Sequence, residues 1–319
     1  MKKSHLKIIF AGSTEFSLNY LKFLLEKNIN VVMLITHKDK KFGRGRKIQK
    51  NAIKKFAENN KIFVLQTNCM KDKKVFQNIS FIKPDLILVI AFGLIFPKKI
   101  IQIPKFGCIN VHPSILPRWR GPSPVQRSII YGDKYTGVTF ISMDENIDTG
   151  MMIEQIFCRI LETDTSEILY KKLFESSKHK LVCLLKNIKK RHKIFFKKQI
   201  GTATYANKIS KCEAKIDWNL PAKKINRYIR AFIPWPVCYF YLNKYRIRVF
   251  KSKIIKKKQE SKKKISGTVI KIDKSGLYIQ TGDGILKIEK IQFPGKKIVS
   301  VRNTLDYQKK IFRIGEILK

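Results

Sequence analysis

The sequence predicts an α/β domain built on a parallel sheet, followed by a smaller β-barrel domain. The 319 residues are enough for two cores, and the hydrophobic fraction of 44% excludes a disordered chain. A strand, a glycine turn, a helix and a second strand fill residues 6–36, and this order belongs to parallel sheets covered by helices. Beyond residue 237, short strand-like runs alternate with turn residues, which is typical of a small barrel.

The first elements follow from the spacing of apolar residues. Residues 6–11 form a short apolar run that ends at Gly12, residues 15–27 show helical spacing, and residues 31–36 supply the next strand. The turn at Gly12-Ser13-Thr14 lacks the second and third glycines of the dinucleotide fingerprint. We therefore reject a nicotinamide cofactor.

The segments from residue 37 to residue 95 alternate between polar sequences and apolar sequences. Residues 37–49 are polar and interrupted by glycines, so we expect an exposed loop without regular structure. Residues 50–60 predict a helix and residues 63–65 a short strand. The apolar run at 86–92 is far shorter than a membrane span and predicts a buried parallel strand. The turn at 92–95 then lies at the carboxyl end of the sheet, where α/β folds bind ligands.

A strand predicted at 109–112 carries two polar side chains suited to catalysis. Asn110 and His112 are two residues apart, so on an extended segment they leave the same face. An amide donor can stabilise an oxyanion while an imidazole transfers a proton. Asp148, in the glycine-ended loop at 144–150, could orient that imidazole. No serine or cysteine lies in an activated nucleophile motif, so the pattern indicates acyl-type transfer without a covalent intermediate.

The remaining elements complete two predicted domains. Pro113 and Pro117 fix φ on either side of a stiff loop. A helix at 123–131, a strand at 136–143 and a long amphipathic helix at 166–188 follow. We predict a catalytic domain at 1–189, a linker at 190–205 and a second domain at 206–319. The second domain has a helical lead-in, a lysine-rich solvent loop at 251–264 and short strands at 238–242, 247–250, 267–272, 277–280 and 285–288.

The motif residues resemble the signature of the folate-dependent formyltransferase family. The resemblance rests on Asn110-x-His112-Pro113-Ser114-x-Leu116-Pro117, Arg120-Gly121-Pro122 and Asp148-Thr149-Gly150. The run at 124–127 is similar to the members that formylate methionyl-tRNA. Further matches are spread over nearly the whole chain, at 8–12, 43–45, 229–236, 282–286 and 295–297.

The resemblance implies a fold and a reaction. The fold is a Rossmann-like parallel-sheet catalytic domain followed by an OB-like β-barrel that contributes to tRNA binding. The reaction moves a formyl group from 10-formyltetrahydrofolate, the donor substrate, to the α-amine of methionine on initiator methionyl-tRNA, for translation initiation. No metal is expected, because attachment to N10 of the folate already activates the formyl group.

The same resemblance assigns roles to residues. Asn110 would donate to the developing oxyanion, His112 would stabilise charge and pass a proton to the leaving nitrogen, and Asp148 would hold His112 and an ordered water. Other residues are assigned to binding: the pterin turn Phe92, Gly93 and Leu94, the folate loop Ser114, Ile115, Leu116 and Pro117, and the tRNA contacts Arg44, Arg46 and Lys47.

Charge and cysteines bound the cellular setting. The net charge of +44 reflects either compositional drift, as in an AT-rich genome, or an RNA partner. Lysines occur on nearly every segment, which favours drift for the larger share. The six cysteines include no Cys-x-x-Cys pair, which argues against zinc and fits free thiols in a reducing cytoplasm. We expect no membrane association and see no sign of an obligate protein partner.

Two alternatives stay open at this point. A related folate enzyme could formylate glycinamide ribonucleotide or an amino sugar, and a non-enzymatic RNA-binding protein could use a decayed scaffold. The complete Asn110, His112 and Asp148 set disfavours decay. The Gly43-Arg44-Gly45 loop and a separate second domain disfavour the small-nucleotide enzyme, whereas an amino-sugar enzyme shares barrel features.

Overall fold

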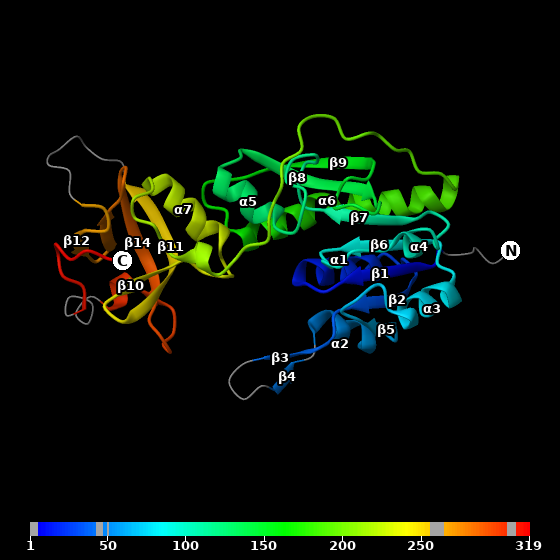
Figure 1. The fold of residues 1–319 in the computed structure, drawn as a ribbon, viewed down its shortest axis with the longest axis horizontal. Coiled ribbons are helices and arrows are strands. Elements are labelled where there is room, and N and C mark those ends of the chain that lie inside the picture. Colours follow the sequence, from blue (N-terminus) through cyan, green and yellow to red (C-terminus); the bar gives the residue numbers. More distant parts are fainter. Residues whose placement is uncertain (1–5, 43–46, 50, 256–264, 305–310) are drawn as a thin grey trace. The chain divides into compact units, whose positions relative to one another are not determined.

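The computed structural model describes residues 6–42, 47–49, 51–255, 265–304 and 311–319 (Figure 1). Within this part of the chain there are two compact units. The N-terminal unit consists of residues up to 124, 135–159 and 170–207, and the C-terminal unit of 125–134, 160–169 and 208–319. Two segments from the middle of the chain, 125–134 and 160–169, thus pack with its last third. The predicted domain boundaries stay a prediction.

The N-terminal unit contains, among its described residues, a seven-stranded sheet in the order β5-β2-β1-β6-β7-β8-β9 (Figure 1). Its first five strands are parallel, and β8 runs antiparallel to both of its neighbours. This confirms the predicted parallel-dominated α/β fold. The strands are β1 (Ile8–Gly12), β2 (Val31–Thr36), β5 (Phe63–Gln66), β6 (Leu86–Ile90), β7 (Cys108–His112), β8 (Tyr135–Ser142) and β9 (Met152–Arg159).

Helices connect these strands and cover the sheet. Thr14 caps α1 through a reciprocal bond with Ser17, which explains why the helix begins directly after β1. The Tyr20 hydroxyl pairs with Ser177 in the core between α1 and α6, and burial raises the pKa of this phenol. The helices are α1 (Glu15–Glu26), α2 (Ala52–Asn59), α3 (Lys73–Ile82), α4 (Lys98–Ile101) and, from residue 170 on, α6 (Ser166–Arg191). Helix α5 (Pro124–Tyr131) follows β7 in the sequence but belongs, from residue 125, to the C-terminal unit.

One expectation for this half of the chain is wrong. Residues 37–49 are not a loop throughout, because β3 (Lys40–Phe42) pairs with β4 (Lys47–Gln49) as an antiparallel ribbon. Such a ladder uses backbone groups of both arms and needs no alternation of apolar residues. Polarity and glycine content therefore could not exclude it.

In its described residues, the C-terminal unit is built on a curled antiparallel sheet with helix α7 (Ala222–Ala231) against it. The strand order is β10-β11-β14-β13-β12, and β15 pairs with the outer part of β14. Helix α7 precedes the sheet, as the predicted lead-in required. The strands are β10 (Tyr239–Leu242), β11 (Tyr245–Ile255), β12 (Val269–Asp273), β13 (Gly276–Gln280), β14 (Ile285–Gln292) and β15 (Val299–Ser300), and two short 3-10 helices lie at Cys212–Ala214 and Val301–Thr304.

Residues 315–319 join the two outer strands of this sheet. Gly315 and Glu316 exchange backbone hydrogen bonds with Val269 of β12, at 2.8 Å each. The Lys319 N–H donates to the carbonyl of Tyr241 in β10 at 3.1 Å. The segment therefore bridges both edges and closes the sheet toward a barrel, which confirms the predicted β-barrel class.

The lysine-rich segment at 251–264 also needs a correction. Its first five residues belong to β11, where Lys253 pairs with Lys287 and Ile255 with Ile285 of β14. Lysines are compatible with a strand whose outer face meets solvent. Residues 256–264 lie outside the described part. No helix among the described residues is both long and apolar enough to span a bilayer.

Candidate active site

Strand β7 presents Asn110 and His112 at its carboxyl end. Asn110 lies beside Val89 of β6 and Ile141 of β8, and His112 lies beside Thr139 of β8. Because the strand is held on both sides, the backbone that carries the two side chains is rigid. The His112 side chain is only 4% exposed.

Asp148 reaches the same place from the loop between β8 and β9. Its backbone has φ of +54°, the left-handed region that most L-residues avoid and aspartate tolerates. The loop packs tightly on the end of β8, since a Cβ on Gly150 would lie 1.6 Å from the Ser142 carbonyl oxygen. Thr149 donates to Asp144 at 2.6 Å and closes the loop on itself.

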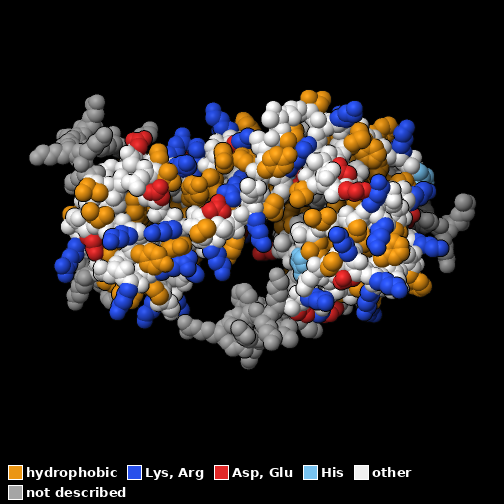
Figure 2. All heavy atoms as spheres, in the orientation of Figure 1, with side chains coloured by type: hydrophobic (Ala, Val, Ile, Leu, Met, Phe, Trp, Pro, Cys, Tyr) orange, Lys and Arg blue, Asp and Glu red, His pale blue; other side chains and the backbone are white. Residues whose placement is uncertain are grey.

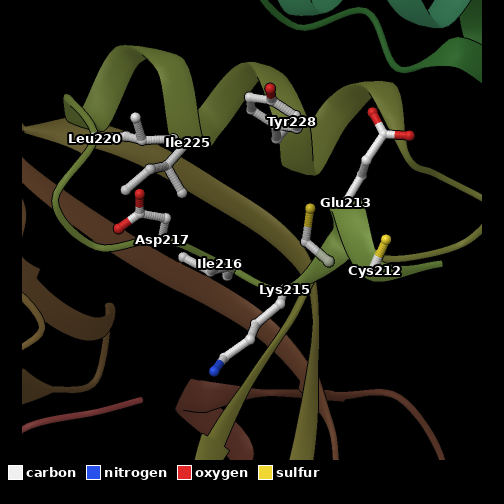
Figure 3. Close-up of a pocket in the computed structure, with 9 residues that line it drawn as sticks. Cys212, Glu213, Lys215, Ile216, Asp217, Leu220, Ile225 and Tyr228 are labelled. Atoms are coloured by element: carbon white, nitrogen blue, oxygen red, sulfur yellow. The ribbon is translucent and has the colours of Figure 1, made fainter. Parts of the chain in front are cut away.

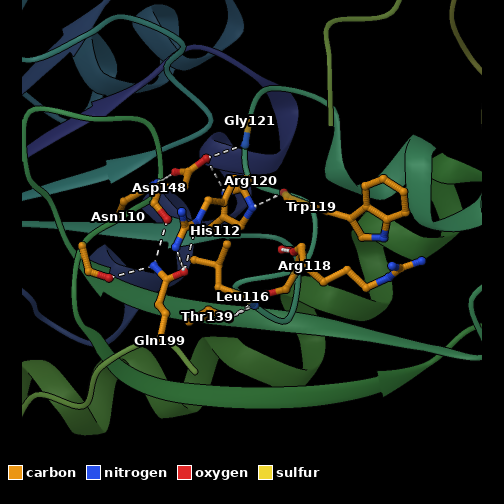
Figure 4. Close-up of polar contacts among 12 residues, drawn as sticks. Asn110, His112, Leu116, Arg118, Trp119, Arg120, Gly121, Thr139, Asp148 and Gln199 are labelled. Atoms are coloured by element: carbon orange, nitrogen blue, oxygen red, sulfur yellow. Dashed lines mark hydrogen bonds and ion pairs between the residues drawn. The ribbon is translucent and has the colours of Figure 1, made fainter. Parts of the chain in front are cut away.

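The carboxylate of Asp148 gathers three groups (Figure 4). Its Oδ1 accepts from Asn110 Nδ2 at 3.0 Å, and its Oδ2 accepts from the Gly121 N–H at 2.8 Å. His112 Nδ1 lies 3.4 Å from Oδ2. This last separation is longer than the roughly 2.7–2.9 Å of a charge-assisted hydrogen bond.

The other nitrogen of His112 has a defined partner as well. Nε2 lies 2.9 Å from the carbonyl oxygen of Trp119. A carbonyl only accepts, so Nε2 carries the hydrogen, and Nδ1 is the nitrogen directed at Asp148. The chain's own backbone thus sets the orientation of the ring.

Several of these partners were missed by reasoning from the sequence. Gly121 N–H, Trp119 C=O and the side chain of Gln199 all contact the predicted catalytic residues or their loops. Gly121 stands inside the quoted motif and Trp119 lies two residues before Gly121, but the residue type does not reveal the role of a backbone group. Gln199 lies in the segment predicted as a linker, and no pattern in the sequence distinguishes it.

The predicted pterin turn follows β6 at the carboxyl edge of the sheet. Phe92 is buried, its ring stacks on His37 at 5.1 Å between centroids, and its carbonyl oxygen lies 2.7 Å from His37 Nε2. Gly93 has φ of +76°, and a Cβ there would meet no atom within 4 Å. Leu94 packs against the core. The turn therefore offers backbone and open space rather than the Phe92 side chain.

The predicted folate loop is held from inside. Ser114 Oγ donates to the Arg118 carbonyl at 2.7 Å, and Thr139 Oγ1 donates to the Ser114 carbonyl at 2.7 Å while accepting from Leu116 N at 3.2 Å. The Leu116–Pro117 peptide is cis, and Ile115 and Pro117 are half-buried. These bonds hold the loop in one conformation. Contact with folate stays a prediction for its four residues.

The predicted tRNA contacts cannot be located. Arg44 and Arg46 lie outside the described residues, and for Lys47 only the backbone, in β4, is described. Among the described residues, no group of three or more His, Cys, Asp or Glu side chains could hold a metal ion.

The C-terminal unit has a cavity of about 190 Å³ beneath α7 (Figure 3). None of the predicted site residues lines it. On its rim, Glu213 accepts from Arg127 of α5 at 2.7 Å. Burial raises the pKa of the Glu213 carboxyl, but hydrogen bonds from Arg127 and from the backbone of Ser210 outweigh burial and leave the pKa below its ordinary value of 4.5. The pair joins α5 to the rest of this unit, so it has a structural use.

Comparisons with known proteins agree over the full length. Residues 6–185 match the family described as Formyl transferase, and residues 208–309 match Formyl transferase, C-terminal domain. The chain is 40% identical over 316 residues to a methionyl-tRNA formyltransferase of Legionella pneumophila (strain Corby), covering 99% of this chain and 100% of that protein. It is also 40% identical over 318 residues to the protein of that name from Buchnera aphidicola subsp. Acyrthosiphon pisum (strain Tuc7), with full coverage of both.

The fold also matches a solved structure at lower identity. HypX from Aquifex aeolicus, in complex with tetrahydrofolic acid, aligns with a TM-score of 0.66 at 16% identity. The match covers 99% of this chain and 51% of that chain. At this identity the likeness concerns the fold alone.

Proposed function

The chain belongs to the formyl transferase family of one-carbon transferases, and on that premise we propose that it formylates the α-amine of methionine on initiator methionyl-tRNA. The donor in this proposal is 10-formyltetrahydrofolate. The relatives that are 40% identical along their whole length are named for a reaction on methionyl-tRNA. The observation that carries the proposal is the convergence of Asn110 and His112 on Asp148.

The reaction exchanges one nitrogen–carbon bond for another. The methionine nitrogen bonds to the formyl carbon, the bond from that carbon to folate N10 breaks, and its electron pair goes to N10. The amine loses one proton and N10 gains one, so a single imidazole can perform the net transfer. His112 is the proposed carrier, and the carboxylate of Asp148 stabilises the ring while it holds the extra proton.

Negative charge on the formyl oxygen needs a donor at the moment of attack. Asn110 Nδ2 carries two hydrogens, and the contact with Asp148 uses one of them. We assign the second to the oxyanion. Because the amide is already oriented by Asp148, little reorganisation is needed when charge develops.

The folate is proposed to lie at the carboxyl edge of the sheet, near β1 and β6. The connection from β1 leads to β2 on one side, while that from β6 leads to β7 on the other. Such a switch of direction is where open α/β sheets bind ligands. The open space at Gly93 supports close approach of a planar ring to the backbone.

An exposed face of the C-terminal unit supports the RNA part of the proposal. Tyr239 and Tyr241 of β10 lie opposite Arg248 and Arg246 of β11. The Arg246 guanidinium lies 3.7 Å from the centre of the Tyr239 ring, and Lys215 Nζ lies 5.8 Å from that of Tyr241. Aromatic faces interleaved with cations suit unpaired bases and phosphates. Arg44, Arg46 and Lys47 are proposed as a second contact with the tRNA.

The cytoplasm is the proposed location. All six cysteines lie in described residues and form no disulfide with one another, which suits a reducing compartment.

One assay tests the function. Purified protein is incubated with 10-formyltetrahydrofolate and either charged initiator tRNA, charged elongator tRNA, glycinamide ribonucleotide or an amino sugar. The expected result is formylation of methionine on initiator tRNA at a rate far above the other three. Preferential formylation of either small amine would replace this proposal with the corresponding alternative.

A further inference from the structure

We propose that Gln199 is a positioning residue of the catalytic site. It joins the Asp148 loop to the Arg120 loop and so fixes the carboxylate that orients His112. The inference rests on the proposed function, because the catalytic role of Asp148 belongs to that proposal. It adds a residue from the segment between α6 and the C-terminal unit.

The side-chain amide of Gln199 is fully used (Figure 4). Its Nε2 donates to the carbonyl oxygens of Asp148 and Gly150, at 2.8 Å each. Its Oε1 accepts from Nε and Nη2 of Arg120, at 3.1 and 2.7 Å. Two donor hydrogens and two lone pairs are the whole capacity of a carboxamide. A carboxylate could make only the contacts to Arg120, and alanine could make neither.

These contacts act on a strained position. Asp148 has a left-handed backbone, and a conformation of this kind persists only when its surroundings hold it. Gln199 binds the carbonyl of Asp148 itself and that of Gly150, two residues on. On the opposite side, Arg120 precedes Gly121, whose N–H binds the Asp148 carboxylate. Two sets of hydrogen bonds therefore connect the Asp148 loop with the Arg120 loop, one through the Asp148 carboxylate and one through Gln199.

The segment that carries Gln199 is itself anchored on both sides of it. Lys197 exchanges backbone hydrogen bonds with Met152 at 2.7 and 2.8 Å. Further along, Arg120 N donates to Thr204 O at 2.9 Å, and Ala206 N donates to Arg120 O at 2.7 Å. The first anchor lies just after the Asp148 loop and the second lies on the Arg120 loop. Gln199 is thus held between the two loops before substrate arrives, as a supporting residue must be.

Two substitutions separate the possible roles. Gln199→Glu keeps both acceptors for Arg120 but places an oxygen against two carbonyl oxygens, and Gln199→Ala removes everything. Ile200→Ala is the matched control, because the Ile200 side chain is next to Gln199 in the sequence, is 85% exposed and is uncharged. A displacement of about 1 Å at a catalytic group costs up to roughly a hundredfold in rate. We expect kcat to fall about ten- to a hundredfold in both Gln199 variants, with KM for folate and tRNA within about threefold and Tm within about 3 °C of the parent.

A merely structural role predicts a different pattern. If Gln199 only anchors Arg120, Gln199→Glu keeps the parental kcat, and that result overturns the proposal. A fall of the same size in Ile200→Ala also overturns it, because any change in the segment would then be equivalent.

Coupling to Asp148 gives a second test. Since Gln199 is proposed to act through that carboxylate, adding Gln199→Glu to Asp148→Ala should lower kcat by less than about twofold further. If the fold decrease in kcat of the double variant equals the product of the two single decreases, Gln199 does not act through Asp148.

A third readout needs no activity. Amide hydrogen exchange over residues 148–152 of the resting protein should be faster in Gln199→Glu and unchanged in Ile200→Ala. Unchanged exchange in Gln199→Glu refutes the positioning role. Failure of the parent to formylate any charged tRNA, with the exchange effect intact, refutes the proposed function and leaves the contact between the loops established.

Discussion

One carboxylate, that of Asp148, holds groups from two other segments of the chain. It accepts hydrogen bonds from Asn110 and from the backbone of Gly121, and it lies 3.4 Å from His112 Nδ1. The left-handed backbone at Asp148 costs about 1–2 kcal/mol, and bonds on both its carboxylate and its carbonyl offset that cost. The position of the Asp148 side chain therefore depends on contacts with residues 110–121 and with Gln199, which lie far from it in the sequence.

Removing members of this set should separate chemistry from binding. His112→Ala should lower kcat by roughly a hundred- to ten-thousandfold, as for loss of acid–base assistance. Asn110→Ala should lower it by about a hundred- to a thousandfold, as for loss of an oxyanion donor. KM for folate and for tRNA should change far less, because neither substrate is held mainly by these groups. Steady-state kinetics with circular dichroism as the folding control provides the measurement.

The double variant of His112 and Asp148 tests how the two act together. The carboxylate works through the imidazole, so the double variant should be only slightly slower than the slower single variant. A near-parental kcat for well-folded His112→Ala would remove the mechanism.

At the scale of elements, the loop between β8 and β9 depends on one glycine. A side chain at Gly150 would clash with the Ser142 carbonyl at the end of β8. The added Cβ is fixed to the loop backbone, and the atom that it meets also belongs to the backbone. The clash can therefore be removed only if the loop that carries Asp148 moves.

Gly150→Ala should therefore lower kcat at least about tenfold, because catalytic geometry tolerates little displacement. Gly295→Ala is the control, since its φ of +71° makes a side chain unfavourable while a Cβ would meet nothing within 4 Å. That variant should lower Tm without changing kcat. Equal kcat values for the two variants would mean that the Gly150 contact does not position Asp148.

Another element-scale prediction concerns α5 and the 3-10 helix at Cys212–Ala214. Arg127 and Glu213 join them through a partly buried pair with side chains 14% and 28% exposed. Arg127→Ala should reduce the free energy of unfolding by about 1–3 kcal/mol at neutral pH. Lys98→Ala, which removes an exposed pair with Glu145, should change it by less than about 1 kcal/mol.

The pH dependence of this effect has a definite sign. The folded protein holds the pKa of Glu213 below 4.5, so the pair's contribution is complete above pH 4.5 and is lost as pH falls through the folded pKa. Urea denaturation at neutral pH and at about pH 3 should show the stabilities of parent and Arg127→Ala converging in acid. A constant difference would assign the effect to packing of the arginine stem instead.

At the scale of the whole molecule, the Lys and Arg residues behind the charge of +44 occur on nearly every segment of the sequence. On the face shown in Figure 2, Lys and Arg side chains are distributed over each unit. Drift as the source of most of the excess stays a prediction. Specific tRNA contacts should then depend on a few residues, against a broad and salt-sensitive attraction.

Arg44→Ala tests one of those contacts. The variant should lose roughly ten- to a hundredfold in kcat/KM for charged initiator tRNA, with an unchanged KM for folate, and its salt slope for tRNA binding should fall by about 1. Arg44→Lys should recover only part, because lysine lacks the planar, multidentate donor set of arginine. Lys38→Ala, an exposed cation in the described part of the same segment, should leave kcat/KM nearly unchanged. If both Arg44 variants keep the parental kcat/KM, Arg44 does not contribute to tRNA recognition and the segment only connects its neighbours.

Much of this architecture could be predicted because local pattern and global fold agree. The apolar runs of β1, β2 and β6, the helix with Pro124 in its first turn, and strands β10, β12, β13 and β14 stand where periodicity indicates. Strand β11 is longer than predicted, and β15 was not predicted. Two omissions have a common cause. The β3–β4 ribbon and strand β9 are edge elements with polar or mixed sequences, and backbone pairing alone defines them.

By itself the sequence determined the fold class, the family resemblance and the shared face of Asn110 and His112. All three can be read from the types of residues and from the spacing between residues that are close in the sequence. Only the tertiary structure decided that Asp148 reaches that face, that Trp119 orients His112, and that Gln199, 51 residues beyond Asp148, holds the loop. Those contacts use backbone carbonyls and single polar side chains that only packing brings together. Such groups follow no periodicity in the sequence, and residue type does not reveal which of them will meet.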